Sequence, residues 1–173
     1  MDLKRLRQRC ETRLRELDLP VPFDIDAFCG VLGTRRGRPI RLCPVTSRAG
    51  PWGLWAAGSD ADYIFYEQAT SPLHREHIIL HEASHLICNH RPVAVSEEEG
   101  SRLLFPDLDV EMVKRVLGRV AYSGDEEREA ELLASLILQR AGSGVASHSR
   151  TADPEHAALL DRLGSALEQP FQN

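Results

Sequence analysis

The segment IILHEASHLI, residues 78 to 87, carries two histidines four positions apart inside a run of apolar side chains. Residues four apart lie one turn apart on the same side of an α-helix, so His81 and His85 would stand next to each other. Ser71 and Pro72 precede the segment in the order that is typical of a helix start. We therefore expect a half-buried helix from about residue 72 to residue 89, because surface histidines rarely lie among so many apolar neighbours.

The spacing H-E-x-x-H suits a metal ion as well as a helix. Two imidazoles one turn apart can bind a single zinc ion, and the carboxylate of Glu82 then lies beside that ion. The other interpretation is an ordinary polar patch, which the apolar surroundings disfavour. The sequence therefore predicts one Zn2+ per chain, held in part by His81 and His85.

A catalytic zinc usually has three protein ligands and one open position for water, so a third ligand must come from elsewhere. His90 is one candidate, although we expect it to lie at the frayed end of the helix. Among the carboxylates of GDEEREAELLASLIL, residues 124 to 138, Glu129 shares a helix face with several leucines. A carboxylate on an apolar face is costly unless a cation or a metal pairs with it, so we predict Glu129 as the third ligand. Its acidic neighbours are expected to face solvent: Glu126, Glu127 and Glu131.

LHEASHLICNH, followed some forty residues later by EREAELLA, resembles the ImmA/IrrE family of zinc metallopeptidases. In that family a downstream Glu-Ala motif supplies the glutamate that completes the metal site, and Glu129 with Ala130 matches this motif. Strand-like residues before the helix, as in WGLWAAGSDADYIFYEQ, also suit the family, so the similarity covers about residues 20–140. The chain departs from the family pattern where Glu131 replaces a frequent asparagine and where Leu138-Gln-Arg replaces Leu-Met-Pro.

The resemblance implies a zinc metallo-endopeptidase in which His81, His85 and Glu129 hold the ion and Glu82 is the general base. Zinc lowers the pKa of its bound water toward neutrality, and Glu82 would take the proton and deliver it to the leaving amine. Members of this family commonly cleave or inactivate a helix-turn-helix transcriptional repressor. The resemblance therefore also implies such a repressor as the protein substrate.

A further hydrogen-bond donor should stabilise the oxyanion that forms on the attacked carbonyl. His74 and His77 lie one or two turns before His81 on much the same side of the helix, so they can line the cleft. Each candidate has an ordinary alternative as a packing or solvated residue. The candidates are Tyr122, His74, His77 and His156.

Two other functions belong to different classes. One is a non-proteolytic zinc-binding regulatory or toxin-like component that acts through protein binding, which the intact Glu82 disfavours. The other is nucleic-acid binding through the arginines of the N-terminal segment. The net charge of −5 makes direct nucleic-acid binding the weakest of the three interpretations.

Apolar periodicity and turn signals predict an α+β, mostly helical domain, and the resemblance implies that this domain is zincin-like. We expect a basic helix at 2–17, a helix at 24–32 that a glycine ends, and strands at 40–43, 52–56 and 63–66 in a small three-stranded antiparallel sheet. Later helices are expected near 107–117 and 123–140, then a flexible linker at 142–152 and a last helix at 153–170. The metallopeptidase domain would span residues 1–141, and a C-terminal helix and tail would span 153–173.

Two features predict a soluble, cytoplasmic protein that does not enter a membrane. No run approaches the length of a membrane-spanning helix, and the charged start MDLKRLRQRC is unlike a signal peptide. The four cysteines lie far apart without a C-x-x-C pair, so we expect free, buried thiols.

Overall fold

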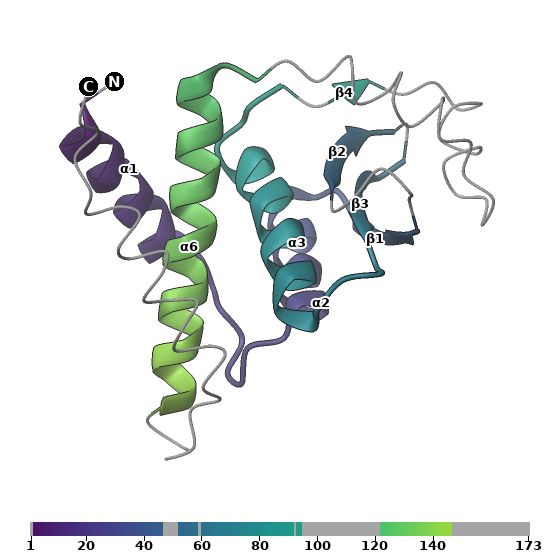
Figure 1. Ribbon diagram of the computed structural model, residues 1–173, viewed down its shortest axis with the longest axis horizontal. Coiled ribbons are helices and arrows are strands. Elements are labelled where there is room, and N and C mark those ends of the chain that lie inside the picture. The colour runs from purple at the N-terminus through teal and green to yellow at the C-terminus, as the bar shows by residue number, and fades with distance from the viewer. Residues whose placement is uncertain (1, 47–51, 59, 92, 95–121, 147–173) are drawn as a thin grey trace.

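The computed structural model describes residues 2–46, 52–58, 60–91, 93–94 and 122–146. Helices and strands are mixed within these ranges, which confirms the predicted α+β class. The elements are, in chain order (Figure 1), α1 (Leu3–Glu16), α2 (Ile25–Arg36), β1 (Ile40–Val45), β2 (Gly53–Ala57), β3 (Asp62–Glu67), α3 (Pro72–Ile87), β4 (Val93–Ala94) and α6 (Gly124–Ala146).

The two helices that carry the candidate site begin at the caps that the sequence predicts. Ser71 accepts a hydrogen bond from the backbone N–H of His74, and Pro72 is the first residue of α3. Ser123 and Glu126 form a capping box at α6, in which each side chain accepts a hydrogen bond from the backbone N–H of the other. Local side chains therefore fix where both helices start.

The helix α2 is longer than expected, because Gly33 does not end it. The helix continues to Arg36, and Gly37 ends it in the left-handed conformation with φ 67°. A Cβ on Gly33 would lie 3.0 Å from the carbonyl oxygen of Arg38 and 3.1 Å from the backbone nitrogen of Ile40. Gly33 thus lets the chain entering β1 pass close to the helix.

The three predicted strands are present, but the sheet is mixed rather than purely antiparallel. Its order is β1-β3-β2-β4, with β2 and β3 antiparallel and with β1 parallel to β3. The short strand β4 pairs in parallel with β2. The expectation was wrong because β1 adds to the far side of β3 instead of pairing with β2, its neighbour in sequence.

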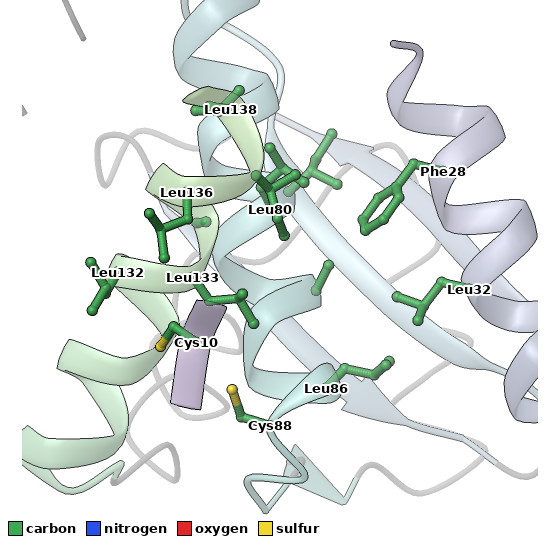
Figure 2. Close-up of a cluster of buried hydrophobic side chains, with 14 of the residues drawn as sticks. Cys10, Phe28, Leu32, Leu80, Leu86, Cys88, Leu132, Leu133, Leu136 and Leu138 are labelled. Atoms are coloured by element: carbon green, nitrogen blue, oxygen red, sulfur yellow. The ribbon is translucent and has the colours of Figure 1, made fainter. Parts of the chain in front are cut away.

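The elements form layers in the order α1, α6, α3 and sheet, and α2 packs against β1 and α3 (Figure 1). The core lies where α3 meets α6 on one side and the sheet and α2 on the other (Figure 2). All four cysteines are free and buried, as predicted. The largest fully buried side chains include Phe28, Ile64, Ile79, Leu80, Leu86, Leu133 and Ile137.

The helix α6 extends further than the sequence pattern predicts. It continues through Gly142 to Ala146 and therefore includes the first residues of the expected linker 142–152. Glycine costs only about 1 kcal/mol in a helix interior, which a helix with a packed apolar face can tolerate. The expected helices near 107–117 and 153–170, and the rest of the linker, lie outside the described residues. Within the part that is described, no helix has the length and apolar character needed to cross a bilayer.

Candidate metal centre

Two histidines of α3 face α6 with their ring nitrogens converging. His81 Nε2 and His85 Nε2 lie 3.1 Å apart, and the ring centroids are 4.8 Å apart. His85 is fully buried, whereas His81 is partly exposed. This is the arrangement that the four-residue spacing on a helix predicts.

The carboxylate that lies close to both Nε2 atoms belongs to Glu127 of α6. Its Oε2 lies 3.4 Å from His81 Nε2 and 3.9 Å from His85 Nε2. Ligand atoms about 2.1 Å from a tetrahedral zinc stand roughly 3.4 Å from one another. The triangle of 3.1, 3.4 and 3.9 Å therefore suits one small cation. The three residues form a candidate metal-binding group.

Glu129, the third ligand expected from the sequence, does not lie with these histidines. Its Oε2 is 2.9 Å from Nη2 of Arg9, and its Oε1 is 3.6 Å from Nη2 of Arg13. Both arginines come from α1, on the other side of α6. Successive helix residues turn by about 100°, so residues 127 and 129 point to nearly opposite sides. Two guanidinium groups therefore supply the positive charge that this buried carboxylate needs.

Glu131 lies one turn after Glu127 on α6 and contacts two histidines of α3. Its carboxylate is 3.2 Å from His81 Nδ1 and 3.3 Å from His77 Nε2. The hydrogen bonds from His77 and then His81 lower the pKa of Glu131 well below its usual range. Burial opposes protonation of His81, but the hydrogen bond with Glu131 and nearby carboxylates raise its pKa. Glu131 was expected to face solvent; its side chain is 44 % exposed and also contacts His77 and His81.

Glu82 is buried against the sheet and fixed by it. Its Oε2 accepts a hydrogen bond of 2.9 Å from the backbone N–H of Trp55 in β2. Burial raises the pKa of Glu82 to about 7, while the positive charge of His81 and the Trp55 hydrogen bond act in the opposite direction. A carboxyl group with a pKa near 7 can both accept and release a proton at neutral pH, which suits a general base.

Tyr122 is the one of the three described cleft candidates that touches the histidine pair. Its ring stacks on His85 with centroids 3.7 Å apart. The hydroxyl is buried and has no hydrogen-bond partner among the described residues. Burial raises the pKa of Tyr122, and Glu82 and Glu127 add to the effect, so the hydroxyl stays protonated as a donor.

The two other described cleft candidates lie further away. His77 contacts Glu131 through Nε2, and its buried Nδ1 has no hydrogen-bond partner in the part of the chain that the structure describes. His74 is exposed and shares a hydrogen bond of 3.0 Å with Thr70, outside the cluster. His156 lies outside the described residues.

His90 is a third histidine at the site, and it does not fray from the helix end. Asn89 takes a positive φ of 57°, and the backbone N–H of His90 then donates to the carbonyl of His85. This turn folds His90 back, where its Nδ1 lies 2.9 Å from Nδ1 of His85. A left-handed asparagine after a helix is the signal that would have predicted it.

Comparison of the chain with protein-family models, with curated proteins and with solved structures finds no match. What can be inferred about the site therefore rests on its own geometry. That geometry brings together two ring nitrogens and a carboxylate oxygen at the distances a small cation requires, with Glu82 and Tyr122 beside them.

Proposed function

We propose that this chain is a zinc-dependent metallo-endopeptidase whose metal is held by His81, His85 and Glu127. The observation that supports this proposal is the convergence of three ligand atoms within 3.1–3.9 Å of one another. Two imidazoles and one carboxylate form a ligand set typical of catalytic zinc in hydrolases. The ligand set keeps both predicted histidines and replaces Glu129 by Glu127.

Glu82 supplies the acid–base chemistry in this proposal. Zinc bound at the three ligands would lower the pKa of a water molecule and polarise a peptide carbonyl. Glu82 accepts the proton of the attacking water and then donates it to the amine that leaves. The Trp55 N–H holds one carboxylate oxygen of Glu82, and we assign proton transfer to the other oxygen. A carboxyl group with a pKa of about 7 suits both steps.

Tyr122 is the residue that we assign to the oxyanion. Its hydroxyl is a protonated donor, buried and without a hydrogen-bond partner within the described ranges, in a ring stacked on His85. A donor that is already in place stabilises negative charge as it develops on the attacked oxygen. Substrate binding would give this hydroxyl its hydrogen-bond partner.

The resemblance to ImmA/IrrE peptidases suggests the class of substrate. Members of that family act on helix-turn-helix repressors, so we propose such a repressor as the protein that is cleaved. In this proposal the glutamate of the Glu-Ala motif, Glu129, does not bind the metal. Glu127, two residues earlier, is the ligand instead. A non-proteolytic zinc-binding role is the alternative that the experiment must separate.

Metal analysis of purified variants tests the ligand set. The parent chain should hold one zinc ion, and Glu127→Ala should lose it, since removal of one of three ligands weakens binding steeply. Glu126→Ala is the matched control: this neighbouring glutamate caps α6 and should leave the zinc content unchanged. Zinc retained by Glu127→Ala but lost by Glu129→Ala would restore the ligand set expected from the sequence.

Cleavage of a repressor encoded beside this chain tests the enzymatic role. Glu82→Gln should keep the zinc and abolish cleavage, because the amide preserves the shape of the side chain but cannot take a proton. If the parent chain and Glu82→Gln bind the repressor equally well and the parent chain does not cleave it, the regulatory alternative is favoured.

A further inference from the structure

His85 contacts a second imidazole through the nitrogen that does not face Glu127. Its Nδ1 lies 2.9 Å from His90 Nδ1, and both residues are buried. A hydrogen bond between two ring nitrogens needs one donor and one acceptor, so the two rings cannot carry the same proton pattern at these atoms. The contact therefore constrains which tautomer each ring takes.

One proton pattern satisfies both the contact between these two rings and the use of His85 Nε2 as a metal ligand. A metal ligand must offer a lone pair at His85 Nε2, which leaves the proton on His85 Nδ1. His90 Nδ1 then accepts that hydrogen bond, and His90 carries its own proton on Nε2. That second proton faces a carboxylate, since His90 Nε2 lies 3.7 Å from Oε2 of Glu129. The chain of contacts runs from His85 through His90 to Glu129.

Two arginines of α1 anchor the far end of this chain. Arg9 and Arg13 lie 2.9 and 3.6 Å from the two oxygens of Glu129, which is 6 % exposed. The Cys10 thiol adds a contact of 3.7 Å to the Glu129 carbonyl oxygen, so α1 is held to α6 here. A charge-assisted pair with two guanidinium groups fixes the position of a carboxylate more firmly than a neutral partner would.

The same region offers a rival interpretation as a second metal site. Cys88, His90 and Glu129 are all buried and bring their ligand atoms within 4.8 Å of one another. The two guanidinium groups on Glu129 already supply the positive charge that a cation would bring. The arrangement thus favours hydrogen bonding over a second ion.

We propose that His90, oriented by Glu129 and the two arginines of α1, is a positioning residue that holds His85 in the tautomer with its proton on Nδ1. In metal sites generally, a carboxylate or carbonyl group accepts a hydrogen bond from the second nitrogen of a metal-binding histidine and so orients its ring. Here the imidazole of His90 stands between the ligand His85 and the carboxylate of Glu129. This role of His90 rests on the proposed function for the use of His85 Nε2 as a ligand. In this proposal the basic N-terminal helix α1 supports the metal centre, because its Arg9 and Arg13 hold Glu129 in place.

Long-range proton–nitrogen NMR of the histidine rings measures the tautomers directly in the full-length, metal-free protein at neutral pH. In the parent chain we expect the proton of His85 on Nδ1 and that of His90 on Nε2. His90→Leu removes the acceptor and should shift His85 to a mixture of tautomers. His90→Asn is the conservative variant, because its side-chain oxygen can stand where Nδ1 stood and should keep the parent tautomer. Protons on Nε2 of His85 in the parent chain would overturn the proposal.

Zinc affinity provides the second readout. His90→Leu and Glu129→Gln should weaken zinc binding about 10- to 100-fold, and His90→Asn should recover most of that loss. Arg5→Gln is the control on α1, since Arg5 pairs only weakly with exposed Asp2, at 3.8 Å, and should leave affinity unchanged. Unchanged affinity in folded Glu129→Gln and His90→Leu would contradict the proposal, as would a second zinc per chain that Cys88→Ser removes.

The two proposals can fail separately. If the parent chain binds no zinc, the proposed function fails, and the tautomers measured in the metal-free protein still decide the role of His90. Circular dichroism checks that each variant folds. If His90→Leu does not fold, Glu129→Gln carries the test, because it keeps the size of the side chain and removes only its charge.

Discussion

Gly53 of β2 and Glu82 of α3 are in such close contact that a Cβ on the glycine would stand 2.8 Å from Oε1 of the glutamate. The same atom would lie 2.7 Å from Cγ2 of Ile78, one turn earlier on the helix. Real Cβ atoms do not approach neighbours so closely, so only glycine lets β2 rest against this part of α3. The strand thereby reaches Glu82 and binds it through the Trp55 N–H.

Gly53→Ala should disturb both the fold and the proposed general base. The added methyl group must push β2 away from α3, which should lower the free energy of unfolding by about 1–3 kcal/mol. The shift also moves Glu82, so cleavage should fall while zinc, held by other residues, remains bound. Thermal unfolding, zinc content and cleavage rate measure the three effects.

Gly30→Ala is the matched control for this substitution. A Cβ on Gly30 meets nothing within 4 Å, and the residue lies inside α2. Alanine in a helix interior is more favourable than glycine by about 0.5–1 kcal/mol, so this variant should be slightly more stable than the parent. A Gly53→Ala protein as stable as Gly30→Ala would show that β2 and α3 are not packed this closely.

The raised pKa of Glu82 predicts how stability depends on pH. The folded, metal-free protein binds a proton at Glu82 up to about pH 7, whereas the unfolded chain loses it near the ordinary value of 4.5. Stability from this group is therefore greatest below pH 4.5 and falls as pH rises to about 7. Glu82→Gln removes this dependence, so its gain in unfolding free energy over the parent should be about 2 kcal/mol larger at pH 8 than at pH 5.

Denaturant unfolding at the two pH values, with a chelator present, measures the difference between the variants. Because only the change between pH 5 and pH 8 is used, effects of the substitution that do not depend on pH cancel. If the difference in unfolding free energy between Glu82→Gln and the parent is the same at pH 5 and pH 8, Glu82 ionises normally in the folded protein.

The histidine pair could be predicted from sequence because its geometry is local. Four residues along a helix bring two side chains together whatever else the chain does, and the caps of α3 and α6 are local as well. Glu82 follows from the same motif. These features depend on residues within one or two turns, and the structure has them where the sequence indicated.

The third carboxylate depends on how α6 is rotated against its neighbours, and no local pattern sets that rotation. Glu127 and Glu131 share the face toward α3, whereas Glu129 turns toward α1. The sequence showed that Glu129 needed a positive partner, and the physical argument was sound. Arg9, which supplies it, is 120 residues away in the chain, so only tertiary packing could choose between an arginine and a metal.

Removal of the metal should destabilise the parent chain and leave a ligand variant unaffected. A ligand that binds only the folded state at 100 times its Kd adds about 2.7 kcal/mol to the free energy of unfolding. For a chain of this size that corresponds to a fall in Tm of roughly 5–10 °C when a chelator strips the zinc. Differential scanning calorimetry with and without chelator measures the shift.

His85→Ala and Glu127→Ala are the comparison variants for the chelator experiment. Both should unfold at the same temperature with and without chelator, because neither holds zinc to lose. A chelator shift that survives in His85→Ala would locate the metal away from the His81–His85 pair, and one that survives only in Glu127→Ala would exclude Glu127 as a ligand.

Tyr122→Phe should separate catalysis from stability. The buried hydroxyl has no hydrogen-bond partner among the residues that the structure describes, so its removal should raise the free energy of unfolding by about 1 kcal/mol. If this hydroxyl donates to the oxyanion, the same change should lower kcat about 100-fold with little effect on KM or zinc content. Tyr63→Phe is the control, because that hydroxyl bonds to exposed Asp60 at 2.8 Å and should leave kcat unchanged. Steady-state cleavage kinetics and thermal unfolding measure both effects, and a Tyr122→Phe enzyme with the parent kcat would exclude the hydroxyl from the reaction.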